Sequence, residues 1–374
     1  MITDTLQLKE ICNKILPAVD NALVDPQHLT STLELIGLNN QLTINVTNRE
    51  YYVSASLNAI MDEPFHATVN AVTFLKLISQ MTSPEINLTV KSNALQVKGN
   101  GNYKLSLIFD NDKLLELPKI NINNITCEMD VPNKVLQDIS KFNSKELKKL
   151  GTKKQTHPLA KMYYIDEQGA ITFNSGACVN SFQLEKPIRL LLNDKLVKLF
   201  KLFTSDIVHM EYGIDQVAEM LQSKIKFTSQ NVTVSALLGD ISNLMGALPL
   251  TSIRKRANDI YDYNIEFSKD EFIAAINRLL IFKANQDSVV VNFEFGSDSL
   301  IIEDKDKKNQ ETIKYLNDPQ MQHYSALIDI MDLKLTLDSY NEESFNLCCG
   351  NHTNIMTIRG NIKNIIPEIA MIRE

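Results

Sequence analysis

Few residues of this chain have the types and spacing that catalysis would need. The segment Ser175-Gly176-Ala177-Cys178 is the one loop that could offer a nucleophile, but no histidine or acid flanks it. The six histidines are scattered, and none has metal-ligand spacing with a cysteine. The sequence has no glycine-rich phosphate loop, no Gly-x-Gly-x-x-Gly turn and no His-Glu-x-x-His pair. We therefore expect neither an enzyme nor a metal or cofactor site.

The chemistry that the sequence does offer is positive charge on helix faces. The predicted helix over residues 134–150 has an apolar face and an opposite face of lysines, and the predicted helix over 194–204 repeats this pattern. Such faces usually serve only solubility, but like charges four residues apart cost ~0.2–0.5 kcal/mol unless an anion lies nearby. The basic residues on these and similar faces are Lys14, Lys76, Lys141, Lys145, Lys148, Lys149, Lys195, Lys198, Lys201 and Arg278.

The net charge of −7 is unevenly divided along the 374 residues. With boundaries near residues 126 and 258, the first third has 9 basic and 12 acidic residues, the middle 18 and 13, and the last 11 and 20. An acidic protein with a basic centre can still bind a polyanion if the basic groups share a surface.

Composition indicates an ordinary globular protein of the cytoplasm. Apolar residues make up 44% of the chain and charged residues 22%. The start Met1–Asp4 lacks the features of a secretory signal, and no apolar stretch reaches the roughly 18 residues of a membrane span. The five cysteines are odd in number and have no framework spacing, so we expect reduced thiols.

A threefold repeat is the main organising signal. A Leu/Ile-Pro step recurs at Leu117-Pro118, Leu248-Pro249 and Ile366-Pro367. A short apolar helix followed by a strand recurs as 73–78 before 86–90, 195–200 before 207–210, and 330–335 before 345–348. The period exceeds the roughly 20–50 residues of solenoid units. The repeat therefore predicts three domains of one architecture, over residues 1–125, 126–258 and 259–374.

Each third is predicted to run helix, strands, helix, strands, which favours an α+β fold with antiparallel sheets. The first helix contains Leu8 to Val19 on one stripe, and Pro17 should kink or split it. Further helices are predicted over 71–81, 134–150, 194–204, 269–283 and 329–340. A meander is predicted over 86–90, 94–98 and 103–109, with a hairpin turn at Gly99–Asn102.

This layout resembles the bacterial-type sliding clamp, the beta subunit of DNA polymerase III. The resemblance rests on triple α+β units with basic helix faces, on Leu248-Pro249 at the exit of the second unit, and on the apolar tail Met371-Ile372-Arg373-Glu374. The family's Thr-Asp-Gly-His-Arg-Leu loop corresponds to 174–179, where only Gly176 is identical, and an acid, Glu374, ends the tail. Such divergence is typical of a distant member, for example one encoded by a phage.

The resemblance implies a DNA-clamp fold that closes into a ring: two protomers, six domains and twelve inward helices. Helices about 10 Å wide would leave a lumen of roughly 28 Å, enough for duplex DNA. The lysines and the arginine named above would face the phosphates without reading bases. The implied partners are double-stranded DNA, a DNA polymerase and a clamp loader, with no membrane.

The resemblance also implies two protein interfaces. The dimer would join Leu105 and Leu107 to Leu280 and Ile281, although these residues could equally be ordinary core. A groove between the second and third domains would take a short apolar peptide from polymerase or loader. Its implied walls are Leu159, Gly176, Val179, Ala247, Leu248, Met371 and Ile372, which could instead close the second domain's core and dock the tail.

Two other functions stay open at this point. The chain could be a non-enzymatic protein-interaction scaffold that binds no DNA, its lysines being only solvated faces. It could also be a nucleic-acid-modifying enzyme with an unrecognised site.

Overall fold

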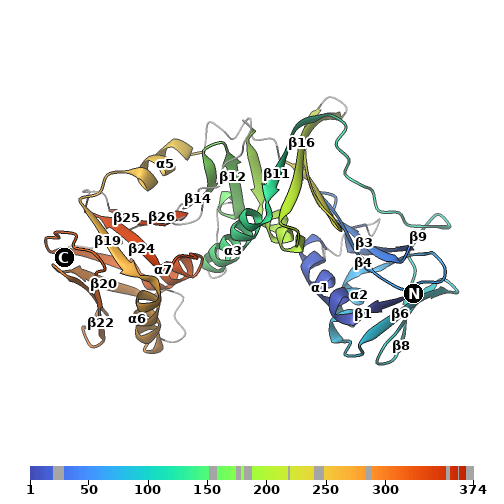
Figure 1. The fold of residues 1–374 in the computed structure, drawn as a ribbon, viewed down its shortest axis with the longest axis horizontal. Coiled ribbons are helices and arrows are strands. Elements are labelled where there is room, and N and C mark those ends of the chain that lie inside the picture. Colours follow the sequence, from blue (N-terminus) through green and yellow to red (C-terminus); the bar gives the residue numbers. More distant parts are fainter. Residues whose placement is uncertain are drawn as a thin grey trace. The chain divides into compact units, whose positions relative to one another are not determined.

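The computed structural model describes residues 1–19, 29–150, 158–173, 178–180, 188–217, 220–239, 248–283, 288–350, 354–360 and 362–367. The fold is α+β with antiparallel sheets, as the sequence predicts (Figure 1). The chain forms two compact units, one of residues 1–140 with 195–240 and the other of residues 141–194 with 241–374.

The first unit holds three sheets, one of them the two-stranded hairpin of β9 and β10, and the helices that pack on them. Its elements up to residue 140 are β1 (Ile2–Asp4), α1 (Thr5–Ile15), β2 (Thr32–Leu38), β3 (Gln41–Thr47), β4 (Tyr51–Asn58), β5 (Phe65–Asn70), α2 (Ala71–Gln80), β6 (Glu85–Lys91), β7 (Ala94–Lys98), β8 (Asn102–Ser106), β9 (Phe109–Asp110), β10 (Lys113–Leu114), β11 (Ile125–Pro132) and the start of α3 (Asn133–Leu150). The second part of the first unit contains α4 (Asp194–Leu199), the 3-10 turn η4 (Phe200–Leu202), β16 (Ile207–Val217), β17 (Met220–Ser229) and β18 (Val232–Leu238).

The second unit is built in the same way. Its elements are β12 (Met162–Asp166), β13 (Gly169–Thr172), β14 (Cys178–Asn180), β15 (Leu190–Asn193), α5 (Leu250–Asn258), β19 (Tyr263–Ser268), α6 (Lys269–Ile281), β20 (Val290–Phe295), β21 (Ser299–Glu303), β22 (Gln310–Lys314), β23 (Tyr324–Asp329), α7 (Ile330–Leu337), β24 (Ser344–Cys349), β25 (Ile355–Arg359) and β26 (Ile362–Pro367). Helices α6 and α7 pack against each other.

One order of elements occurs three times, in β1–β8, β11–β18 and β19–β26. Each repeat contributes two four-stranded layers, and layers from successive repeats join edge to edge. The sheet β11-β16-β17-β18-β4-β3-β2-β5 joins the first repeat to the second through β4 and β18. The sheet β15-β12-β13-β14-β26-β25-β24-β19 joins the second to the third through β14 and β26, which are the same two positions.

Strand β11 begins at Ile125 and β19 at Tyr263, close to the predicted domain boundaries. The boundaries themselves stay predictions, since the contacts divide the chain into two units. The Leu-Pro steps are also not fully equivalent. Leu117 and Leu248 are buried in the segments that connect repeats, whereas Ile366-Pro367 ends β26.

The last residue of a strand caps the next helix in four places. Asp4 accepts a hydrogen bond from the amide of Gln7 at 2.8 Å, and Asn70 accepts one from Thr73 at 2.9 Å. Ser268 and Asp329 cap α6 and α7 in the same manner. A cap contributes about 1 kcal/mol, and it fixes where each strand turns into a helix.

Aromatic clusters fill the core behind the helices. In the second unit Phe272 of α6 is fully buried and lies 5.1 Å from Phe267 and 5.2 Å from Phe345 between ring centroids. In the first unit Phe200 lies 5.0 Å from Phe227. The predicted split of the first helix is confirmed, because α1 ends at Ile15 and a 3-10 turn with Pro17 follows.

The first unit's eight-stranded sheet has one apolar and one polar face. On the polar face one row of registered residues crosses all eight strands, in the order Asp130, His209, Thr228, Thr233, Ser54, Asn45, Glu34 and Thr68. Asn45, Glu34 and Thr68 are nevertheless buried. Their burial means that another part of the chain covers this end of the row.

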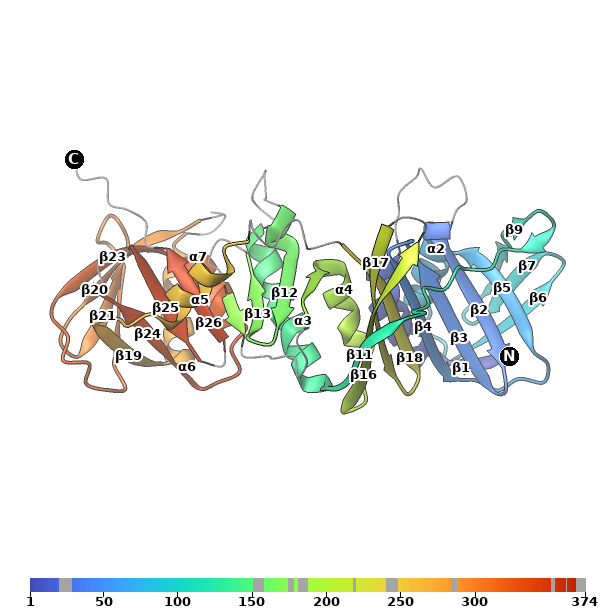
Figure 2. The same cartoon turned by 90° about the horizontal axis from the view of Figure 1, so that it is seen from above.

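At Thr68 the cover includes residues 107–124, which we call the strap. The strap contains the β9–β10 hairpin, and Figure 2 shows its teal trace running from there past β4 to β11. At its start, the hydroxyl of Thr68 donates to the carbonyl oxygen of Ile108 at 2.8 Å, and the amide of Ile108 donates to the carbonyl oxygen of Thr68 at 2.9 Å. Leu115 and Leu117 are buried along its course. No helix in the described part of the chain is long and apolar enough to cross a membrane.

Candidate partner-binding cluster, basic helix faces and strand edges

An apolar cluster lies where the second and third repeats meet in the second unit; we call it the seam cluster. Its segments are β12, β13, β15, β26 and the connection that contains α5. Its buried members are Tyr164, Ile171, Leu191, Leu248, Leu250, Ile253, Ala257 and Ile365, with Leu159, Met162, Phe173 and Ile355 packed against them. Five separated segments thus meet in one buried apolar cluster.

Two of the predicted groove residues, Leu159 and Leu248, belong to this cluster. Val179 lies on β14, where its backbone pairs with Ile171 and Lys363. Four further predicted residues lie outside the described residues, and the grouping of the full set stays a prediction. These four are Gly176, Ala247, Met371 and Ile372.

Sequence reasoning missed α5, although its signal was present. Leu250, Ile253 and Ala257 recur three and four residues apart directly after Pro249, and all three are buried in the cluster. Pro249 occupies the N-cap position, where a missing amide hydrogen costs nothing. The short length of the helix and its run of Arg254, Lys255 and Arg256 hid the pattern.

A partly buried ion pair attaches α5 to β12. Arg254 donates to Oδ1 of Asp166 at 2.6 Å, and Asp166 also accepts from the amide of Gln168 at 2.8 Å. Burial, and next the charge of Asp166, raise the pKa of Tyr164 to about 12. The Nε of Arg254 is buried and has no partner among the described residues. One hydrogen-bond donor is therefore unused beside the seam cluster.

The predicted basic faces are partly described. Lys76 on α2 is exposed, and Lys14 on α1 pairs with Glu10 at 2.6 Å. Lys141 is exposed and donates to Asn341. Lys195 and Lys201 are exposed and Lys198 is half-buried, and each of the three makes an interaction of its own. The side chains of Lys145, Lys148 and Lys149 lie outside the described residues, so their role stays a prediction.

Arg278 has a carboxylate partner that the sequence did not indicate. Its Nε and a terminal nitrogen donate to the two oxygens of Glu311 at 2.8 and 2.6 Å. This bonding raises the pKa of Arg278 and lowers that of Glu311. The pair ties α6 to strand β22 and neutralises the guanidinium locally, while its role towards DNA stays a prediction.

Two strand edges carry exposed apolar side chains. Leu105 and Leu107, in and after β8, are half-buried, and Tyr103 and Phe109 beside them are exposed. At the end of α6, Leu280 is half-buried. Ile281 and Phe282 follow it with 71% and 63% of their surface exposed. Tyr103, Phe109 and Phe282 were missed by sequence reasoning, since periodicity cannot say which edge of a sheet lacks a neighbour.

The chain matches no family model, and no curated protein matches it in sequence. Its fold, however, is that of solved sliding clamps over nearly the full length. The DNA polymerase III beta subunit from Thermotoga maritima has 12% identity, a TM-score of 0.72 and 99% coverage of both chains. The beta clamp of Helicobacter pylori bound to a DNA ligase peptide has 15% identity, a TM-score of 0.72 and the same coverage.

The DNA polymerase III subunit beta from Borrelia burgdorferi, in complex with a natural product, gives 14% identity and a TM-score of 0.73, again with 99% of both chains covered. At such identity the likeness establishes the fold and leaves function to be argued from the residues.

Proposed function

We propose that the chain is a DNA sliding clamp that encircles duplex DNA as a ring of two copies and tethers the replicative polymerase. The observation that carries the proposal is the match of the whole chain to clamp folds, with 99% of both chains covered. A match of this length includes all three repeats and the seams between them. The domains would be 1–125, 126–258 and 259–374.

The strand order supports closure of the ring. Strand β14 has the same place in the second repeat as β4 has in the first, and β26 has the same place in the third repeat as β18 has in the second. The pairs β4–β18 and β14–β26 therefore join successive repeats through the same two strand positions. The first repeat keeps β8 and the third keeps β22 as sheet edges among the described strands. Pairing β22 of one copy with β8 of another would apply the same rule a third time. Two copies then close a ring without an open edge at these positions.

The side chains at these two edges suit an interface. Tyr103 and Phe109 beside β8, and Ile281 and Phe282 beside β22, are exposed in the single chain. Burying apolar area of this kind yields roughly 25 cal/mol per Å². The pair Arg278–Glu311 would hold β22 in place for its partner strand.

The function needs no chemical step, so the proposed clamp is not an enzyme. Lysines on the helices would attract phosphates at any sequence, and closure of the ring would prevent escape while allowing sliding. The seam cluster would receive the apolar peptide of a polymerase or clamp loader, as the Helicobacter pylori clamp receives a ligase peptide. The protein would act in the cytoplasm on the nucleoid, or in a host cell if a phage encodes it.

Loading on circular DNA tests the proposal. The protein is placed on nicked circular DNA, by its loader or passively at high concentration, and the circle is then linearised. A sliding clamp leaves through the free ends, so retention should fall to the level of linear DNA. A groove-binding enzyme would stay bound after linearisation, and a scaffold that binds no DNA would never be retained.

A further inference from the structure

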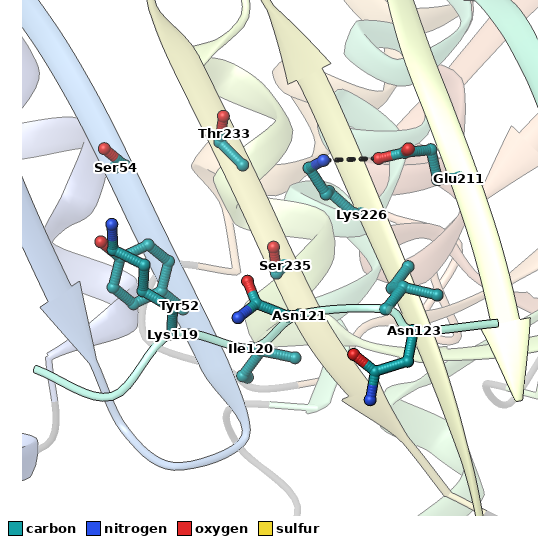
Figure 3. A pocket seen from close by; sticks show the side chains of 11 residues that line it. Tyr52, Ser54, Lys119, Ile120, Asn121, Asn123, Glu211, Lys226, Thr233 and Ser235 are labelled. Atoms are coloured by element: carbon teal, nitrogen blue, oxygen red, sulfur yellow. Dashed lines mark ion pairs between the residues drawn. The ribbon is translucent and has the colours of Figure 1, made fainter. Parts of the chain in front are cut away.

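A pocket of about 580 Å³ lies under the strap in the first unit, and nothing in the proposed function uses it (Figure 3). It opens over the seam of β4 and β18, where the first and second repeats meet. Its floor is one registered row of the polar face, formed by Tyr52, Ser235, Lys226 and Glu211 on four adjacent strands. Its roof is strap residues 119–123.

The floor offers hydrogen-bond groups that the protein itself does not use. Ser54 and Thr233 face each other across the seam, and Tyr52 faces Ser235. Among the described residues, none of these four hydroxyls has a hydrogen-bond partner, and Ser54 and Thr233 are half-buried. All four side chains line the pocket, so their hydroxyls are available to a bound ligand.

The charge of the pocket favours an anion. Lys226 is paired with Glu211 at 2.6 Å, which leaves that pair neutral, as Figure 3 shows by a dashed line. Lys119 on the roof is exposed and forms no ion pair with any described residue. The charged residues that line the pocket therefore sum to +1, and several hydroxyl donors lie beside them. A carboxylate or another oxyanion would satisfy both features.

Hydrogen bonds from the strap to side chains of β16 and β17 fix the roof of the pocket. Asp215 accepts hydrogen bonds from the amides of Asn123 and Asn124, and Lys224 donates to the carbonyl of Asn121 at 2.8 Å. Gly213 allows the strap to lie directly on β16, because a Cβ there would come within 2.2 Å of the carbonyl oxygen of Asn124. A roof fixed in this way can preorganise a binding site.

We propose that this pocket binds a glutamate or aspartate side chain of an acidic peptide segment from a protein partner. The oxyanion chemistry rests on the pocket alone. The choice of a peptide rests on the proposed function, because the corresponding seam, β14–β26, carries the apolar cluster assigned there to partner peptides. The two seams then differ in chemistry: one takes apolar side chains and the other takes an acid.

The test uses the full-length protein and a fluorescein-labelled heptapeptide with four glutamates spaced by glycines. Its matched control is the same peptide with four glutamines. Fluorescence anisotropy at about 50 mM salt measures binding, since low salt preserves charge interactions. We expect the glutamate peptide to bind at least about 10-fold more tightly than the glutamine peptide. No DNA enters this assay, so its failure is distinct from failure of the loading experiment.

Three variants locate the site. Lys119→Glu reverses the roof charge, and Thr233→Val removes a hydroxyl while keeping the side-chain shape. Each variant should bind the glutamate peptide roughly 10-fold less tightly than the wild type does. Lys113→Glu makes the same charge change on exposed β10 outside the pocket and should leave binding within about 2-fold.

Specific outcomes would overturn the proposal. If Lys113→Glu weakens binding of the glutamate peptide as much as Lys119→Glu does, the peptide is attracted by the general charge of the surface and not by the pocket. Equal binding of the two peptides would mean that the carboxylate is not recognised. Unchanged binding by Thr233→Val, with normal thermal unfolding, would assign the hydroxyls to water. Complete displacement of the peptide by inorganic phosphate at about 1 mM, well below the ionic strength of the assay, would assign the pocket to a small free anion.

Discussion

The carboxylate of Asp215 accepts a hydrogen bond from Nζ of Lys224 at 2.8 Å, and this pair anchors the strap to the sheet. Both side chains are largely buried, and both also bind the strap's backbone between residues 121 and 124. Removing either partner would leave a buried charge and several backbone groups unsatisfied. The segment between the first two repeats is thus held by side chains of the second repeat.

Acid should release the strap at its Asp215 anchor. Hydrogen bonding from Lys224, then from the amide of Asn123, holds the pKa of Asp215 below its ordinary value of 3.8. Because the folded-state pKa is lowered, the stabilisation is present above the unfolded pKa and disappears as pH falls through the folded value. Hydrogen exchange of residues 119–124, followed by mass spectrometry, should rise selectively below about pH 3.8 relative to the intrinsic rate. Asp215→Asn should exchange rapidly at every pH, whereas Asp62→Asn, at an exposed loop position, should behave as wild type.

Gly213→Ala should displace the strap while leaving its anchoring side chains intact. The added methyl group would lie 2.2 Å from the carbonyl oxygen of Asn124 and 2.3 Å from Cγ2 of Ile122, closer than atoms can pack. Limited trypsin digestion should then cut after Lys119 at least about 10-fold faster than in wild type. Gly239→Ala is the control, because a Cβ there meets nothing within 4 Å. Equal cleavage in wild type and Gly213→Ala would contradict the close packing of the strap.

Charge reversal on the helices should weaken DNA retention without opening the ring. The triple variant Lys76→Glu, Lys195→Glu and Lys201→Glu removes three basic groups of the first unit. Each lysine that neutralises a phosphate contributes roughly 0.9 to the slope of log K against log salt, so the slope should fall by about 2.7. Changing Lys91, Lys98 and Lys113 to Glu gives the same charge change on exposed hairpin positions and should leave the slope unaltered. If both triple variants reduce the slope equally, the helix lysines attract DNA only through the overall charge of the protein.

Phe282→Asp should weaken the dimer. Phe282 is 63% exposed in the single chain, so the change should not disturb folding, but a charge there would be buried at the proposed edge beside β22. Loss of an aromatic anchor at the centre of an interface costs at least about 2 kcal/mol, or roughly a 30-fold weaker dimer. Sedimentation velocity at micromolar concentration would measure it. Ile260→Asp is the matched control at an 88% exposed position after α5, and a monomeric wild type would refute the ring outright.

Among the described residues, sequence periodicity predicted every α-helix except α5, because each of the others buries one face against a sheet. The expected helix over 71–81 is α2 (Ala71–Gln80), and the one over 269–283 is α6 (Lys269–Ile281). The expected strand over 94–98 is β7 with the same bounds, and the one over 86–90 lies within β6 (Glu85–Lys91). The hairpin turn at Gly99–Asn102 also lies where it was predicted.

The sites were less accessible to sequence reasoning, because they depend on contacts between distant segments. Nothing near Asp215 in the sequence signals a strap some ninety residues earlier, and Arg278 gave no sign of its partner Glu311. The polar row on the first unit's sheet becomes visible only when eight strands are placed in register. The seam cluster was found in part, through Leu159 and Leu248, since a family resemblance supplied the long-range pairing.

Ile253→Thr should weaken peptide binding at the seam cluster while keeping the fold. Ile253 on α5 is 8% exposed and packs in the cluster, so the change replaces its buried ethyl arm by a shorter, polar hydroxyl. A fluorescein-labelled pentapeptide with two leucines and a phenylalanine should bind roughly 10-fold less tightly, because about 1–2 kcal/mol of apolar contact is lost. Thr251→Ala, at an exposed position on the same helix, should bind as wild type. If Ile253→Thr keeps full affinity and normal thermal unfolding, apolar peptides bind elsewhere and the cluster serves only to join the repeats.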